Sequence, residues 1–313
     1  MTEMKTDEHR YPEWNTTEWL GKFNSAMHPV NHHALKQLRQ MVYYNTLNIV
    51  RAGGYRTEDG TVVSLPLDDE IIKNTRFYHR EIPQKEPSTR FAMEISVVQQ
   101  DSLSCARQLL QQGEREVCVL NMASRSNPGG GALVGSGAQE EYLFRCSNYF
   151  RSLYQYVDFA DLYDIPRSKY SYPLDRNFGG IFTPNATVFR DLESKGYKLL
   201  NEPFKVNFIA AAAISHPKVV NDRIADELLF CVRKKMHTLF RIALDNQQEV
   251  LVLGAWGCGA FANPPQHVAE LFQETLQEEE FKGAFRKVLF AIKGGPRAGN
   301  YQPFKDVLNP DVN

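Results

Sequence analysis

The sequence lacks any long hydrophobic run. Its longest apolar stretches, residues 206–214 and 250–256, are far shorter than the roughly 20 residues that cross a bilayer. The first residues, MTEMKTDEHRYPEW, are polar and mixed in charge, without the apolar core or the small-residue cleavage site of a secretory signal. We therefore expect a cytoplasmic protein that does not associate with membranes.

An excess of charge of one sign is also absent. The 313 residues contain 36 Lys and Arg against 37 Asp and Glu, which gives a formal net charge of -1 at pH 7. Binding of duplex nucleic acid by general electrostatics needs clustered cations that neutralise phosphates. We expect no such binding, and any polyanionic ligand must be held by local groups. The hydrophobic content of 42% excludes a disordered or collagen-like chain.

Cysteines with the spacing of a disulfide framework or a zinc site are lacking as well. The five cysteines share no regular spacing and no CxxC motif: Cys105, Cys118, Cys146, Cys231 and Cys258. The histidines likewise show no metal-ligand spacing, so we expect no metal centre. Most of the thiols should be small buried groups. Without an identifiable His partner for Cys258, a covalent cysteine mechanism is not favoured.

The order of the predicted elements indicates an α/β fold with an N-terminal helical extension. A helix is expected at residues 33–51, ended by Gly53 and followed by a short hairpin. Strands and helices then alternate and are connected by short loops, which is typical of a largely parallel sheet. We therefore divide the chain into an extension, residues 1–90, that packs on a core, residues 91–313.

The expected core elements are the following. Strands are predicted at residues 94–99, 116–123, 206–214, 250–256 and 287–293, with an edge strand at residues 187–190. Helices are predicted at residues 101–113, 139–154, 219–244 and 265–280.

The clearest motif is a glycine-rich loop between a strand and a helix. Its residues run from the strand end to the helix start: Asn121, Gly129, Gly130, Gly131, Gln139, Glu140 and Glu141. A fold retains three consecutive glycines where a ligand or another backbone comes close. Backbone N–H groups at a helix N-terminus favour phosphate, so the loop predicts an anion site. The alternative is a flexible turn before a helix that begins with acids. No Gly-Lys-Ser/Thr follows, which excludes a P-loop.

A second glycine-rich loop follows the strand at residues 250–256. It consists of Gly257, Cys258, Gly259, Ala260 and Phe261 and leads to another helix. Gly257, Gly259 and Ala262 match the dinucleotide pattern G-x-G-x-x-[GA], although two prolines at the helix start are foreign to it. Both loops leave the carboxyl ends of strands in one predicted sheet. We therefore expect one diphosphate to be held by both.

Three carboxylates are candidates for the chemistry. Glu140 and Glu141 are adjacent, so on a helix their side chains diverge by about 100° and cannot act as a facing pair on one bond. At least one of them must face the site, where it suits a general acid, unless both are solvated acids on the helix surface. Asp101 follows the first core strand, and we expect it to cap the next helix or to bind a nucleobase amino group.

These motifs resemble those of a known family. The segment NPGGGALVGSGAQEE is similar to the GGG…QEE signature of poly(ADP-ribose) glycohydrolases. LNMASRSNPGGG, FTPNATVFRD and GAWGCGAFANPP resemble the microbial type, and the likeness runs from about residue 34 to residue 304. The resemblance implies a macrodomain-like three-layer α/β/α core with a mixed, largely parallel sheet. It also makes residues 91–313 the catalytic domain, with ADP-ribose as ligand and no cofactor.

The resemblance further implies a role for each candidate. Residues 129–131 would line the diphosphate on one side and residues 257–260 on the other, with Phe261 near the distal ribose. Glu141 would protonate the departing oxygen of the ribose–ribose bond, and Glu140 would hold ribose hydroxyls. The remaining roles are support of the loop by Gln139, contact with the distal ribose by Asn121, and contact with the adenine amino group by Asp101.

The predicted function is therefore hydrolysis of poly(ADP-ribose) on modified proteins. One alternative removes single ADP-ribose units from a protein or nucleic-acid acceptor. Another is a macrodomain that binds ADP-ribose without cleaving it, but such a protein needs no acid at the scissile bond. An NAD-dependent oxidoreductase would rest only on Gly257, Gly259 and Ala262 and lacks a convincing ribose-binding acid.

Overall fold

The contacts of the chain divide it into two compact units. The computed structural model describes residues 11–65, 69–294 and 299–309. Unit 1 combines residues 1–73, 129–153 and 186–205, and unit 2 combines residues 74–128, 154–185 and 206–313. Each unit is thus built from three separate segments. The division into an extension at residues 1–90 and a core at residues 91–313 stays a prediction.

Unit 2 contains most of a seven-stranded sheet with the order β3-β6-β7-β5-β10-β11-β4. The strands are β3 (Arg76–Tyr78), β4 (Glu94–Val98), β5 (Val117–Met122), β6 (Gly180–Arg190), β7 (Leu199–Ala211), β10 (Val250–Leu253) and β11 (Lys287–Ala291). β5 pairs in parallel with β7 and β10, β11 with β10 and β4, whereas β3 pairs antiparallel with β6. The sheet is therefore mixed and largely parallel, as predicted.

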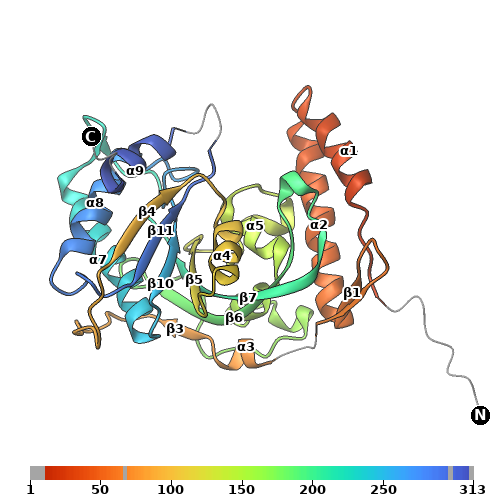
Figure 1. Cartoon of the computed structure of the whole chain (residues 1–313), viewed down its shortest axis with the longest axis horizontal. Coiled ribbons are helices and arrows are strands. Elements are labelled where there is room, and N and C mark those ends of the chain that lie inside the picture. Colours follow the sequence, from red (N-terminus) through yellow and green to blue (C-terminus); the bar gives the residue numbers. More distant parts are fainter. Residues whose placement is uncertain (1–10, 66–68, 295–298, 310–313) are drawn as a thin grey trace, which may run out of the picture. The chain divides into compact units, whose positions relative to one another are not determined.

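Helices cover both faces of the sheet in unit 2. One side of β10, β11 and β4 is covered by three helices: α7 (Asp226–Asp245), α8 (Pro265–Gln277) and α9 (Tyr301–Leu308) (Figure 1). The other side is covered by α4 (Ser102–Gln111). Alternate residues of β5, Cys118 and Leu120, belong to the same buried cluster as Phe240 of α7 and Phe272 of α8. This alternation places one face of the strand against those helices. The three-layer α/β/α prediction is confirmed.

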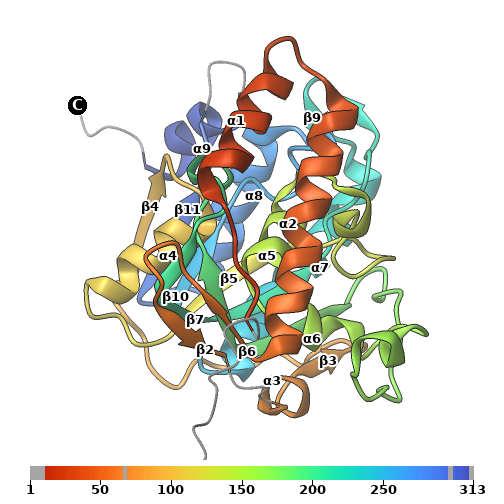
Figure 2. The ribbon, with the colours of Figure 1, turned by 90° about the vertical axis from the view of Figure 1, so that its right-hand side faces the viewer.

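Unit 1 is arranged around the long helix α2 (His32–Ala52), which packs beside α1 (Thr16–Met27) (Figure 2). Asn31 caps α2 by accepting a hydrogen bond from the Ala34 N–H, and Gly53, at φ 71°, ends it. The other elements are β1 (Gly54–Arg56), β2 (Val62–Ser64), α3 (Glu70–Lys73), α5 (Gln139–Cys146), α6 (Phe150–Tyr154) and 3-10 turns at Ala132–Val134 and Glu193–Lys195. The predicted helix and hairpin of this region are confirmed.

The single helix predicted at residues 139–154 is wrong, because two helices, α5 and α6, occupy this region. Between them Ser147 is extended and forms a bridge with Val188. The Asn148 N–H donates to the Thr187 carbonyl, and the Thr187 N–H donates back to Asn148 Oδ1, at 3.1 and 2.8 Å. Pairing with β6 thus replaces the helical hydrogen bonds at this point.

Two further boundaries differ from the prediction. The strand predicted at residues 187–190 is the last part of a longer strand, β6, which is second in the sheet order. β3 pairs with residues 180–182 of β6, and Val188 forms a bridge with Ser147. The helix predicted from residue 219 begins at residue 226, since the preceding residues form the hairpin β8 (Val219–Val220) and β9 (Arg223–Ile224). Asn221 and Asp222 make its turn at φ 49° and 57°, a conformation that Asn and Asp tolerate.

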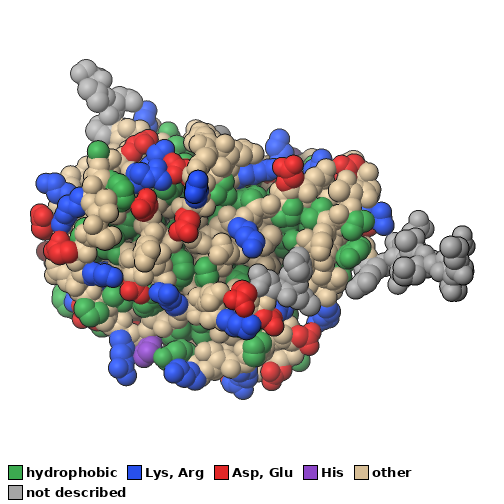
Figure 3. All heavy atoms as spheres, turned by 60° about the horizontal axis from the view of Figure 1, so that its bottom comes forward, with side chains coloured by type: hydrophobic (Ala, Val, Ile, Leu, Met, Phe, Trp, Pro, Cys, Tyr) green, Lys and Arg blue, Asp and Glu red, His purple; other side chains and the backbone are tan. Residues whose placement is uncertain are grey.

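The surface carries charges of both signs. On the face shown in Figure 3, Lys and Arg side chains are interspersed with Asp and Glu, in line with the balanced composition. Within the described part of the chain, no helix has both the length and the apolar character needed to cross a membrane.

Glu114 provides a test of the ion pairs in unit 2. Arg286 Nη1 and Nη2 donate to its carboxylate at 3.1 and 2.5 Å, and Lys287 Nζ lies 3.1 Å away. The hydrogen bonds from Arg286 lower the pKa of Glu114 to about 2, although partial burial opposes them. Because the folded-state pKa is depressed, this stabilisation is complete above the unfolded pKa of about 4.3 and is lost as the pH falls toward 2.

We therefore expect Glu114→Gln to lower the free energy of unfolding at pH 7 by about 1–2 kcal/mol. The difference from the native protein should shrink between pH 4.5 and pH 2, as measured by urea unfolding at several pH values. Glu116→Gln, at an exposed neighbouring position, is the matched control and should change little. A difference that persists unchanged at pH 2 would contradict the assignment.

Candidate active site

The glycine loop and the two adjacent acids lie together in unit 1. Glu140 and Glu141, in the first turn of α5, are only 4% and 7% exposed. The Gly129 N–H donates to Glu140 Oε1 at 3.0 Å, and the Gly131 N–H donates to Glu141 Oε1 at 2.9 Å. Both acids therefore bind the loop, and the alternative of two solvated surface acids is wrong.

Each of the three glycines is required by its surroundings. A Cβ at Gly129 would lie 2.4 Å from the Phe144 ring, and one at Gly130 would lie 2.5 Å from Glu141 Oε1. At Gly131 it would lie 2.2 Å from the Ser136 hydroxyl oxygen. Gly129 and Gly130 also have φ of 78° and 54°, which favours glycine. The loop thus packs closely against α5, and the alternative of a flexible turn is wrong.

One oxygen of Glu141 is left for another group. Oε1 is held by the Gly131 amide, whereas Oε2 is buried and has no hydrogen-bond partner among the described residues. Across those residues Glu141 also makes no ion pair. Buried polar atoms are nearly always paired, so an unpaired carboxyl oxygen needs an explanation such as a ligand. Oε2 is therefore one of the buried polar atoms of unit 1 that the described residues leave without a hydrogen-bond partner.

In unit 2 the parallel strands bring several predicted residues to one edge of the sheet. Asn121 is fully buried near the carboxyl end of β5, where it aligns with Ala210 of β7. Asp101 follows β4 and caps α4, because its Oδ1 accepts the Leu103 and Ser104 N–H groups at 3.1 and 3.0 Å. The capping role of Asp101 is thus confirmed. Ligands of open α/β sheets bind at this edge.

The second glycine loop, also in unit 2, is held by a residue that the sequence did not single out. Asn263 is 5% exposed, and its Nδ2 group donates to the carbonyl oxygens of Ile214 and Gly257 at 2.7 and 3.0 Å. A Cβ at Gly257 would lie 2.6 Å from that amide nitrogen, and Gly257 has φ 76°. The Gly259 and Ala260 amides donate to no protein acceptor among the described residues, so they are available to a ligand.

The thiol on this loop is not poised as a nucleophile. Burial raises the pKa of Cys258 to about 12, and its Sγ donates to the Trp256 carbonyl at 3.6 Å. Because the thiolate is the reactive form, little of it is present near pH 7. The absence of a covalent intermediate at Cys258 stays a prediction.

Two other donors hold the chain where β7 ends. Trp256 Nε1 donates to the Ala211 carbonyl at 3.1 Å, and Lys235 Nζ donates to the Ala212 carbonyl at 2.8 Å. Burial, followed by the charge of Arg125, lowers the pKa of Lys235 to about 8. Sequence reasoning missed Lys235 because a lysine in an amphipathic helix ordinarily lies on the exposed face.

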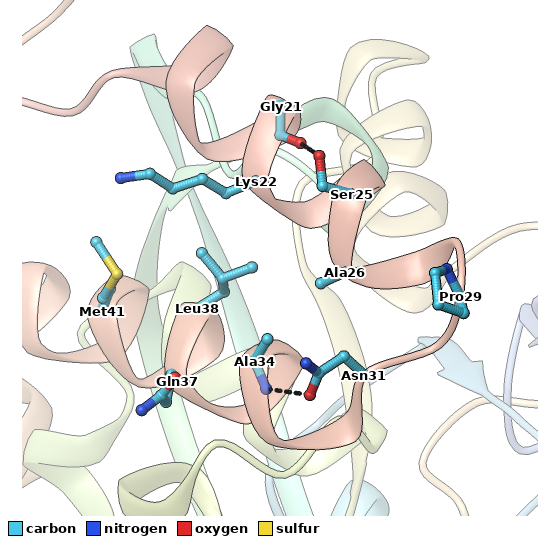
Figure 4. Close-up of a pocket in the computed structure, with 10 residues that line it drawn as sticks. All are labelled: Gly21, Lys22, Ser25, Ala26, Pro29, Asn31, Ala34, Gln37, Leu38 and Met41. Atoms are coloured by element: carbon cyan, nitrogen blue, oxygen red, sulfur yellow. Dashed lines mark hydrogen bonds between the residues drawn. The ribbon is translucent and has the colours of Figure 1, made fainter.

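Unit 1 also has a groove of about 600 Å³ between α1 and α2 (Figure 4). Its lining consists of Gly21, Lys22, Ser25, Ala26, Pro29, Asn31, Ala34, Gln37, Leu38 and Met41. None of the predicted site residues lies in it. Within the described ranges, no three His, Cys, Asp or Glu side chains are grouped so as to hold a metal ion.

Comparison with known proteins identifies the family. Residues 44–191 match the family described as microbial-type PARG, catalytic domain. The crystal structure of poly(ADP-ribose) glycohydrolase (PARG) from Thermomonospora curvata is 30% identical, with a TM-score of 0.69, over 86% of this chain and 99% of that chain. The chain belongs to this family.

Members of the PARG family are also solved with ligands. The T. curvata enzyme bound to the inhibitor ADP-HPD is 30% identical, with a TM-score of 0.68, over 85% of this chain and 97% of that chain. The PARG from Deinococcus radiodurans in complex with ADP-ribose is 29% identical, with a TM-score of 0.60, over 79% and 99% of the two chains. No curated protein sequence matches the chain.

Gly130 provides a test of the loop geometry. Gly130→Ala puts a Cβ against Glu141 Oε1 and forces alanine into a left-handed conformation. We expect a loss of about 1–2 kcal/mol from the conformation alone, measured by thermal or urea unfolding. The matched control is Gly21→Ala in α1, which has open space around it and should stabilise the protein slightly. A neutral Gly130→Ala would contradict the close approach of the loop to the carboxylate.

Proposed function

We propose that this chain is a poly(ADP-ribose) glycohydrolase that hydrolyses ribose–ribose O-glycosidic bonds and releases ADP-ribose. Membership of the PARG family supports the activity, since relatives of that name are solved with ADP-ribose or ADP-HPD bound. The observation that carries the proposal is the buried carboxyl of Glu141, with one oxygen held by Gly131 and the other unpartnered.

The proposed chemistry needs one acid. Protonated Glu141 gives its proton through Oε2 to the departing oxygen of the ribose–ribose bond, and that C–O bond breaks through an oxocarbenium-like state. Water then adds to the ribosyl carbon on the face opened by departure, and its proton returns to the Glu141 carboxylate. The Gly131 amide keeps the carboxyl in one orientation during both steps.

Further roles are proposed for the residues of unit 1. Residues 129–131 line the diphosphate. The Gly130 N–H is the amide proposed to bind it, because the Gly129 and Gly131 N–H groups are already bonded to Glu140 and Glu141. Glu140, already held by the Gly129 N–H, fixes the ribose hydroxyls, and Gln139 supports the loop. A fixed ribose supplies the orientation that the general acid needs.

Roles for unit 2 follow from the edge of the sheet. We propose that residues 257–260 bind the diphosphate through the amides that the loop leaves available, and that Phe261 and Asn121 contact the distal ribose. Asp101 accepts a hydrogen bond from the adenine amino group.

The wider setting is also part of the proposal. Residues 91–313 act as the catalytic domain, and residues 1–90 as an extension packed on it. The substrates are ADP-ribose polymers on modified proteins, in the cytoplasm, without direct binding to duplex nucleic acid. The balanced charge of the chain supports the last point.

Glu141→Gln tests the acid. The substitution keeps the size of the side chain and an oxygen for the Gly131 amide, but removes the transferable proton. We expect release of ADP-ribose from poly(ADP-ribose) to fall by about 10²–10⁴-fold, with unchanged affinity for ADP-ribose by calorimetry. Chromatography of the released small molecules measures the activity. Glu18→Gln, an exposed glutamate in the first turn of α1, is the control.

The same assay separates the alternatives. Full activity of Glu141→Gln would remove this residue from the mechanism. Release only from singly modified substrates would indicate a mono-ADP-ribosyl hydrolase, and binding of ADP-ribose without any release would indicate a reader.

Asn263→Ala tests the second loop. Loss of the side-chain amide releases the Gly257 and Ile214 carbonyls, so the loop should no longer hold one conformation. We expect the Kd for ADP-ribose to rise by about tenfold, which corresponds to about 1.4 kcal/mol. Calorimetry measures the change, and Asn201→Ala at an exposed position is the control. Unaltered affinity would show that the loop does not contribute to binding.

A further inference from the structure

The segment between the three glycines and α5 lies directly on α2. A Cβ at Gly135 would lie 2.0 Å from the Lys36 carbonyl oxygen, so the loop backbone touches the helix backbone there. A Cβ at Gly137 would lie 2.5 Å from Arg39 Nη1. The loop that precedes the proposed acid is therefore pressed against α2 at two points.

A chain of hydrogen bonds leads from a buried arginine to Glu141. Arg145 is 1% exposed, and its Nη1 donates to the Ser136 carbonyl at 2.7 Å. The Ser136 N–H donates to the Gly131 carbonyl at 3.0 Å, and the Gly131 N–H donates to Glu141 Oε1 at 2.9 Å. Arg145 thus reaches Glu141 through the loop, although the two residues are one helical turn apart on α5.

The same arginine is anchored from the other side. Its Nε donates to Tyr197 Oη at 2.8 Å, and Tyr197 Oη donates to Glu193 Oε1 at 3.1 Å. Arg39 of α2 then holds Glu193 with two hydrogen bonds, from Nε at 2.7 Å and Nη2 at 3.2 Å. Tyr197 and Arg145 are fully buried, so the hydrogen bond between them is shielded from water, whereas Arg39 and Glu193 are each 18% exposed.

The charges agree with this geometry. Burial lowers the pKa of Arg39, but Glu193 and, more weakly, Tyr197 and Glu141 outweigh it and raise the value above its ordinary range. Arg39 is therefore charged at every relevant pH and lies within electrostatic range of the proposed acid. The network has a cation at each end, Arg39 and Arg145, with Glu193 between them.

We propose that Arg145 is a positioning residue for Glu141, anchored through Tyr197 and Glu193 to Arg39 of α2. This rests on the proposed function of Glu141. The N-terminal helix α2 is then part of the catalytic machinery, because it fixes the loop that orients the acid. A displacement of about 1 Å in a reacting group lowers turnover by about a hundredfold, so a small relaxation of this network is sufficient to matter.

The test is Tyr197→Phe, which removes the hydroxyl that joins Arg145 to Glu193 and leaves the ring in place. We expect kcat for ADP-ribose release to fall 10- to 100-fold, with KM and ADP-ribose affinity within threefold of the native protein. Arg145→Lys keeps the charge but replaces the planar guanidinium, whose Nε and Nη1 donate to Tyr197 and Ser136, by a single nitrogen, so kcat should also fall. Arg241→Lys, which breaks the paired hydrogen bonds to Glu280 in unit 2, is the control for simple destabilisation.

A second readout does not depend on turnover. Hydrogen exchange of the Gly131 and Ser136 amides, followed by NMR at a temperature where both proteins are folded, should be faster in Tyr197→Phe. Exchange at the native rate would overturn the proposal even if the native protein proved inactive. Unchanged kcat in Tyr197→Phe, or an equal loss in Arg241→Lys, would overturn it too. Inactivity of the native protein with faster exchange would instead count against the proposed function alone.

Discussion

The hydrogen bonds from the glycine-loop amides to two buried carboxylates are the constraint on which the site depends. Glu140 and Glu141 are nearly inaccessible to water, and the Gly129 and Gly131 N–H groups replace part of their hydration. Close approach of this kind excludes a Cβ on the loop, as the contact at Gly130 shows. The glycine run and the adjacent glutamates therefore depend on each other: the carboxylates need the loop N–H groups as partners, and the loop needs glycines to approach the carboxylates.

A different principle organises unit 2. Parallel pairing of β5, β7, β10 and β11 sends the following loops to one edge of the sheet. Backbone groups at such an edge need partners, and side chains from the surrounding elements supply them. Trp256, Lys235 and Asn263 cap the carbonyls of three residues that end or follow β7. The loops stay ordered without ladder hydrogen bonds of their own.

The sequence predicted the features that depend on local patterns. Helical periodicity and the Gly53 stop defined α2, and apolar runs defined the central strands. Features that depend on partners remote in the sequence were not predicted. Ser147 leaves the helix because β6 offers pairing, and Asn263 matters through carbonyls that are remote in sequence. For the site, the glycine-rich motif indicated Glu140 and Glu141 as candidates. Only the fold showed that both are buried and that Arg145 donates a hydrogen bond to the loop that contacts them.

The interior of unit 1 balances its charges without neutralising the proposed acid. Arg39, Arg145 and Arg190 are largely or fully buried, as are three of the glutamates of the unit, those at positions 140, 141 and 193. Arg190 is satisfied by uncharged oxygens, for example Thr46 Oγ1 at 2.9 Å. Arg39 is satisfied by Glu193, so neither cation occupies an oxygen of Glu141. A direct ion pair between an arginine and Glu141 would occupy Glu141 Oε2. Among the described residues this atom is the only buried carboxyl oxygen without a hydrogen-bond partner. Because these cations contact other groups, Glu141 Oε2 stays available for the reaction that we propose.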